Sequence, residues 1–185
     1  MDTELFVHFA EIAGVFVGFA ALISVRSAKP SDVHDVTYLR GVLGMGLWVV
    51  VAALLAIVLS RYGLADRTLW VSSAVVGLVL WAALVIVLNR TPESRTLNSS
   101  PERLDRLFPI VGLPLHIVGA GSLVLIILGI RPGIDAALYV TALTTAVVFA
   151  GYTLLALAFS RQPASDPPGA DLEPPSPPSL GATAE

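Results

Sequence analysis

The sequence of 185 residues contains no cysteine, and charged residues make up only 14% of it. Without cysteine the chain can form no disulfide, no thiolate metal site and no cysteine nucleophile. Because soluble domains carry about 25% charged residues, the shortage of charge argues against a soluble fold. A net charge of −3 also lacks the basic footprint of a nucleic-acid-binding protein.

The sequence also lacks the short motifs that carry common enzyme chemistry. It contains no HExxH zinc motif, no GxSxG nucleophile elbow and no glycine-rich phosphate-binding loop. Its polar segments are too short to form a separate catalytic domain, and no acidic cluster suits a divalent ion. We therefore expect no enzyme activity, no metal site and no cofactor.

Five long apolar stretches take up most of the chain. Each has the ~20 residues that a helix needs to cross a hydrocarbon core of ~30 Å. Because lipid cannot pair with backbone N–H and C=O groups, each stretch must satisfy its own backbone as a helix. The sequence therefore predicts an all-α, polytopic transmembrane bundle within residues 1–162. The predicted spans are 5–25, 41–60, 68–89, 109–130 and 136–160.

Positively charged residues are divided unequally between the two sides of these spans, and the richer side tends to stay cytoplasmic. One side holds eight: Arg26, Lys29, Arg40, Arg90, Arg95, Arg103, Arg106 and Arg161. The other side holds only Arg61, Arg67 and Arg131. This bias places the N-terminus outside and the C-terminus in the cytoplasm. The composition, rich in arginine and alanine, favours a bacterial origin, so we expect the inner membrane.

Polar residues and prolines mark the expected helix ends. Ser31 is placed to cap a helix that begins at Asp32, and Asp66 and Asp135 stand at the expected N-caps of the third and fifth spans. Pro114 is predicted to kink the fourth span, because proline removes a backbone donor and clashes with the preceding turn.

Two polar segments flank the last two spans. Ser100-Pro101 predicts a short amphipathic helix whose Arg103 and Arg106 contact anionic lipid headgroups. Plain retention of positive charge in the cytoplasm explains these arginines equally well. Residues 163–185 contain seven prolines, four acids and no lysine or arginine, so we expect a disordered, proline-rich, acidic cytoplasmic tail.

The first span has two unlike faces. Its small or polar residues share an arc of about 120° on a helix of 100° per residue, and they are Glu4, His8, Glu11, Gly14, Gly18 and Leu22. The other half carries Phe6, Phe9, Ile12, Phe16, Ala20 and Ile23. We expect the polar half to face the other helices and the bulky half to face lipid. The GxxxG from Gly14 to Gly18 allows close packing within one chain or between copies.

The same span resembles a group of known sequences. Ala10-Glu11-Ile12, followed by Gly18-Phe19 and Leu22, is similar to the first helix of certain uncharacterised bacterial multi-span inner-membrane proteins. The resemblance implies no activity and no catalytic residue. It implies that Glu11 and Gly18 matter together.

Glu11 is the only carboxylate inside the five apolar stretches. It lies ~9 Å inside the core, where an ionisable group is costly unless it is protonated or paired and is by default a functional hypothesis. His8, Ser73 and Thr141 lie at similar depths and would form a polar cluster with it, although serine and threonine also bond to their own helix carbonyls. His116 is predicted to face the bundle about 10 Å deeper, so it would join only through a relay.

Two functions fit this pattern. The first is a structural or accessory membrane component that acts through helix packing and self-association, with Gly14 and Gly18 at the interface and Glu11 supplying a hydrogen bond. The alternative is a proton- or ion-conducting channel or transporter, with Glu11 titrating, His8 and His116 as relay members and Thr141 as hydrogen-bond partner. The first function predicts a homo-oligomer through self-association. The alternative also favours one, because five helices barely enclose a water path.

Overall fold

The computed structural model describes residues 3–26, 33–90 and 103–160, and all regular structure in these ranges is helical. Five long helices form the bundle: α1 (Thr3–Arg26), α2 (Val33–Arg61), α3 (Asp66–Asn89), α5 (Arg103–Leu128) and α6 (Asp135–Ser160), with a short 3-10 helix η1 (Pro132–Ile134) before α6. Each of the five is long and apolar enough to cross a membrane. The predicted fold class is therefore confirmed. The predicted tail, Ser31, Asp32 and Ser100-Pro101 lie outside the described residues.

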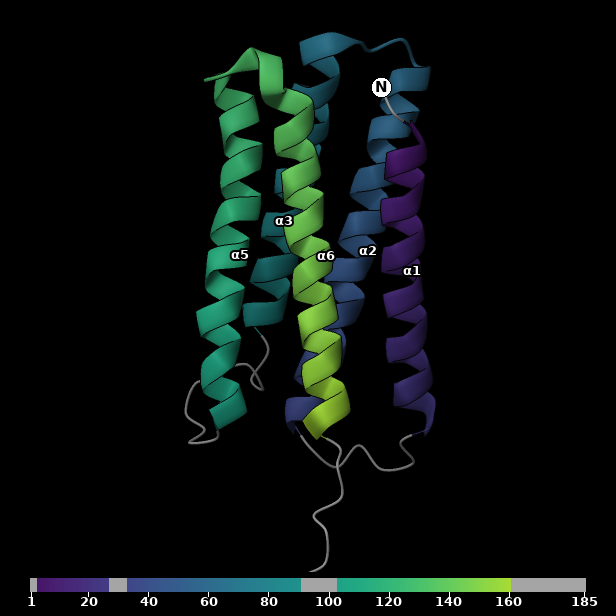
Figure 1. The fold of residues 1–185 in the computed structure, drawn as a ribbon, viewed down its shortest axis with the longest axis vertical. Helices are drawn as coiled ribbons and strands as arrows, with labels where there is room; N and C mark the ends of the chain where they lie inside the picture. The colour runs from purple at the N-terminus through teal and green to yellow at the C-terminus, as the bar shows by residue number, and fades with distance from the viewer. Residues whose placement is uncertain (1–2, 27–32, 91–102, 161–185) are drawn as a thin grey trace, which may run out of the picture.

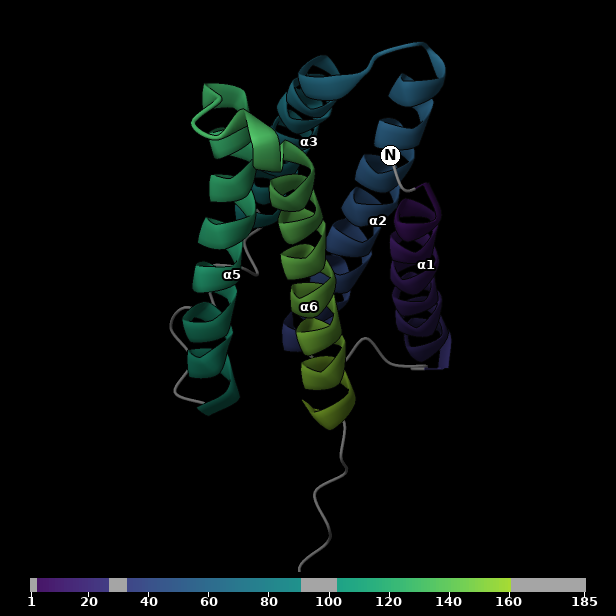
Figure 2. The ribbon, with the colours of Figure 1, turned by 45° about the horizontal axis from the view of Figure 1, so that its top comes forward.

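The five helices run side by side along one axis and alternate in direction (Figure 1). α6 is central and packs against α2 and α5, with further contacts to α1 and α3. α1 packs mainly on α2, so it lies at one edge of the bundle, and α5 lies at the opposite edge (Figures 1 and 2). One side of α1 therefore makes no packing contact with the other helices that the structure describes.

Small side chains let the central helices approach closely. The buried alanines Ala52, Ala53 and Ala56 lie on α2, and Ala142, Ala146 and Ala150 lie on α6. Gly46 has the same role between α2 and α1, since a Cβ there would lie 2.6 Å from Val17 Cγ2. Helices in lipid associate largely through such close packing. The contacts at Gly46 thus hold α1 on α2.

The ends of the helices differ from the sequence prediction in several places, and α5 ends at Leu128 instead of residue 130. The N-cap of α3 is Ala65 and not Asp66, because the helix begins at Asp66 itself. Asp135 is the first residue of α6 and is 2% exposed, and neither of its carboxylate oxygens has a hydrogen-bond partner among the described residues. α5 runs unbroken from Arg103 through Pro114, so within the described residues Arg103 and Arg106 belong to α5 itself and not to a separate short helix. The lipid contact of Arg103 and Arg106 stays a prediction.

Candidate interaction face on α1

The orientation of α1 is the reverse of the one predicted. Phe6, Ala13 and Ala20 are almost fully buried, at 2%, 1% and 0% exposure, whereas Glu11 and Gly18 are exposed. The prediction that the bulky half faces lipid and the polar half faces the bundle is therefore wrong within one protomer. Gly46 on α2 lies against Val17 and Gly151 on α6 lies against the Phe16 ring, which gives complementary packing on this side of α1.

An aromatic cluster fixes this orientation at the N-terminal end of α1. Phe6 lies 6.0 Å from Trp70 on α3 and 6.1 Å from Tyr139 on α6, measured between ring centroids. Trp70 and Tyr139 are 5.7 Å apart, and the Tyr139 hydroxyl donates to the Ala52 carbonyl at 2.9 Å. Aromatic pairs at such distances attract beyond their burial. Phe6 thus ties α1 to α3 and α6 and turns its polar side outward.

The outward side, which we name the polar face of α1, consists of Glu4, His8, Glu11, Gly14, Gly18 and Leu22. His8 Nδ1 lies 3.1 Å from Glu11 Oε2, and the two side chains are 67% and 65% exposed. A Cβ at Gly14 or Gly18 would meet no described atom within 4 Å. The prediction that these glycines pack within one chain is therefore wrong among the described residues, and their packing between copies stays a prediction.

The predicted polar cluster around Glu11 does not form in the protomer. Ser73 is fully buried on α3, whereas Glu11 is exposed at the edge of the bundle. Thr141 is exposed on α6, and its hydroxyl donates to the carbonyl of Ala137 at 2.8 Å. His8 is the one predicted member that contacts Glu11. Thr141 therefore follows the common pattern of a threonine bonded to its own helix.

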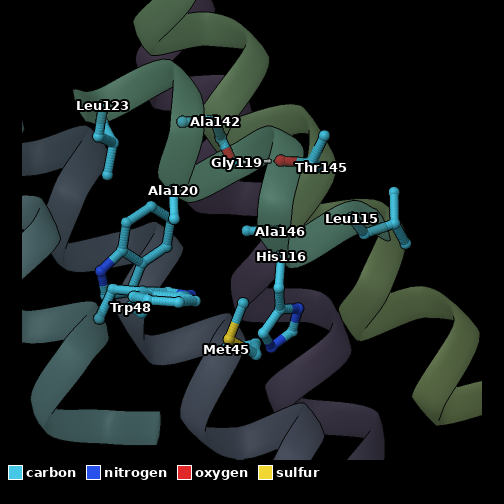
Figure 3. A pocket seen from close by; sticks show the side chains of 11 residues that line it. Met45, Trp48, Leu115, His116, Gly119, Ala120, Leu123, Ala142, Thr145 and Ala146 are labelled. Atoms are coloured by element: carbon cyan, nitrogen blue, oxygen red, sulfur yellow. Dashed lines mark hydrogen bonds between the residues drawn. The ribbon is translucent and has the colours of Figure 1, made fainter. Parts of the chain in front are cut away.

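His116 faces the bundle, as predicted. Its ring lies 5.7 Å from Trp81 and 4.5 Å from Phe149, both edge-on. It also lines a cavity of about 10 Å³ beside the Met45 side chain (Figure 3). A cavity of this volume holds about one water molecule. These contacts describe a packed histidine, and a relay from it to Glu11 stays a prediction.

Comparisons with known proteins do not assign this chain to a family. No protein-family model matches the chain, and no curated protein or solved structure matches it significantly. Within the described ranges, no three or more His, Cys, Asp or Glu side chains gather where they would hold a metal ion. The polar face of α1 is therefore the feature of this chain that bears most directly on its function.

Proposed function

We propose that the protein is a structural or accessory membrane component that self-associates through the polar face of α1. The observation that carries this proposal is that Glu11 and His8 lie inside a membrane span but outside the bundle. Ionisable side chains at this depth in lipid are costly, and they normally face other helices. A second copy of α1 removes this cost by covering both side chains.

The spacing of the polar face supports close pairing of two α1 helices. Gly14 and Gly18 are one turn apart, about 6 Å along the axis, and both have open space above them. A twofold pair uses the same patch on both copies, so the glycines of one helix pack on those of the other. Glu11 then lies one turn away, beside His8 and Glu11 of the second copy. A hydrogen bond there closes the polar end of the interface.

The membrane and the orientation belong to the same proposal. Eight positive charges against three favour a cytoplasmic C-terminus and, for a bacterial chain, the inner membrane. α1 then enters from outside, and Glu11 lies in the outer half of the bilayer.

Replacing Glu11 tests whether its side chain supports association. Glu11→Leu removes the interhelical hydrogen bond, worth about 0.6–2 kcal/mol in lipid, and is expected to weaken association roughly 3- to 30-fold. Glu11→Gln keeps a hydrogen-bonding group and should stay within about threefold of wild type. Energy transfer between labelled copies in liposomes, at several protein-to-lipid ratios, measures both. Thr141→Val is the matched control, because Thr141 is exposed on α6 outside the polar face. Unchanged association of Glu11→Leu contradicts the proposal.

The same liposomes separate this function from conduction. With a pH gradient across the membrane, a structural component is expected to carry no proton flux as wild type or as Glu11→Gln. Flux in wild type that disappears in Glu11→Gln replaces the proposed function with the conducting alternative.

A further inference from the structure

An apolar groove lies on the outside of the bundle between α2 and α3. Six residues line it: Gly44, Leu47, Trp48, Val51, Leu80 and Leu84. Its volume is about 200 Å³, and Leu47, Val51 and Leu80 are 60%, 39% and 39% exposed. A closed apolar cavity of about 150 Å³ holds a molecule such as benzene. The groove therefore has room for several methylene groups and opens toward the lipid.

Two contacts between α2 and α3 keep the groove in shape. The Trp48 indole donates from Nε1 to the Gly77 carbonyl at 2.9 Å, in a buried position. Leu84 covers Gly44 so closely that a Cβ there would lie 2.8 Å from Leu84 Cδ1. Both walls are thus held by fixed contacts, and an occupant enters a site that is already formed.

Two arginines lie beyond the same end of this groove along the helix axes. One stripe of α2 carries four residues at spacings of four, three and four: Arg40, Gly44, Leu47 and Val51. Arg40 lies about 6 Å beyond Gly44 along the axis, and Arg90 lies about 9 Å beyond Leu84 toward the same end. Both side chains are exposed. The distance from Arg40 to Val51, about 16 Å, is close to half of a ~30 Å hydrocarbon core.

We propose that the groove binds an acyl chain of an anionic phospholipid whose phosphate lies at Arg40 and Arg90. The apolar walls match a hydrocarbon chain, and guanidinium groups bind phosphate through paired, charge-assisted hydrogen bonds. The stretch from Arg40 to Val51 is about as long as the hydrocarbon layer of one leaflet. One phospholipid can therefore contact the arginines with its phosphate and the groove with an acyl chain. α1 lines no part of the groove, so this site is independent of the proposed self-association.

Native mass spectrometry tests the site on the full chain. The purified protein is incubated in detergent with phosphatidylglycerol or with phosphatidylcholine of the same acyl chains, and the retained lipid is counted. Phosphatidylglycerol is expected to be retained in preference. Arg40→Gln and Arg90→Gln should each lower its retention about fivefold, the effect of one arginine near an anionic headgroup. Arg61→Gln, at the other end of α2, should leave it unchanged.

A second pair of variants tests the apolar part of the site. Val51→Phe fills the groove and is expected to lower phosphatidylglycerol retention, whereas Val58→Phe, two turns along the same stripe and 47% exposed, should not. A photoreactive residue in place of Leu47 detects bound lipid directly, without relying on a loss of binding. It should cross-link to the lipid. Equal retention of the two lipids, equal effects of Val51→Phe and Val58→Phe, or cross-linking of Leu47 to a second copy overturns the proposal.

Discussion

Replacing both Gly14 and Gly18 by isoleucine is expected to abolish self-association and to leave the protomer folded. No described atom lies within 4 Å of a Cβ at either position, so the new side chains fit the isolated protomer. Between two copies they hold the helix backbones apart and remove the close packing that drives association in lipid. We expect association in liposomes to fall by about tenfold or more, which corresponds to at least about 1.4 kcal/mol.

The control for this pair is Gly121→Ile on α5. Gly121 also has open space around it, but it lies outside the polar face of α1. Energy transfer between labelled copies should match wild type for Gly121→Ile and should be lost for the double variant. Equal losses in both would assign the effect to added bulk on any helix and would remove the support for α1.

In contrast to the double variant at Gly14 and Gly18, Gly46→Leu is expected to destabilise the protomer itself. A Cβ at Gly46 would lie 2.6 Å from Val17 Cγ2 and 3.4 Å from the Ala13 carbonyl oxygen. The Ala13 carbonyl belongs to a helix backbone and has little freedom to move, so α1 must shift away from α2. Overpacking of this kind costs about 1–3 kcal/mol.

Thermal unfolding in detergent measures the effect of Gly46→Leu, with Gly14→Leu as the matched control. Gly46→Leu should lower the unfolding temperature clearly, and Gly14→Leu should leave it close to wild type because its side chain meets open space. An unchanged unfolding temperature for Gly46→Leu would mean that α1 is not held on α2 by this contact.

The fold was largely predictable because the bilayer limits the choices. A stretch of ~20 apolar residues must form a helix in lipid. Each of the five predicted spans coincides with a helix of the structure, although α5 ends at Leu128, two residues before the predicted end of the fourth span. The exact ends were less predictable, as Asp66 shows. A residue that is able to cap a helix marks its start only if the helix begins at the next residue. α3 begins at Asp66 itself, so its N-cap is Ala65.

The face that α1 buries was not predictable from α1 alone. The pattern correctly placed Glu11, Gly14 and Gly18 on one side of the helix. It did not reveal whether that side faces the bundle or points away from it. The deciding contacts come from residues far away in the sequence, such as Gly46 on α2 and Tyr139 on α6. A polar stripe is equally compatible with a partner helix in the same chain and with one in another copy.

The groove between α2 and α3 was invisible in the sequence for a related reason. Its walls come from two helices, and their relative rotation is set by contacts such as that between Trp48 and Gly77. No periodicity within either helix encodes that rotation. Arg40 and Arg90 were identified only as part of the charge bias, because their shared position depends on how Gly44 meets Leu84.

Disulfide formation between single cysteines tests the central claim most directly. The chain contains no cysteine, so Leu22→Cys on the polar face of α1 allows only a bond between copies. Such a bond requires Cα atoms within about 7 Å, which a close α1 pair provides. Oxidation in membranes is predicted to give a reducible dimer for Leu22→Cys and none for Val87→Cys, an equally exposed position near the corresponding end of α3. A monomeric Leu22→Cys beside a cross-linked Val87→Cys would contradict the account.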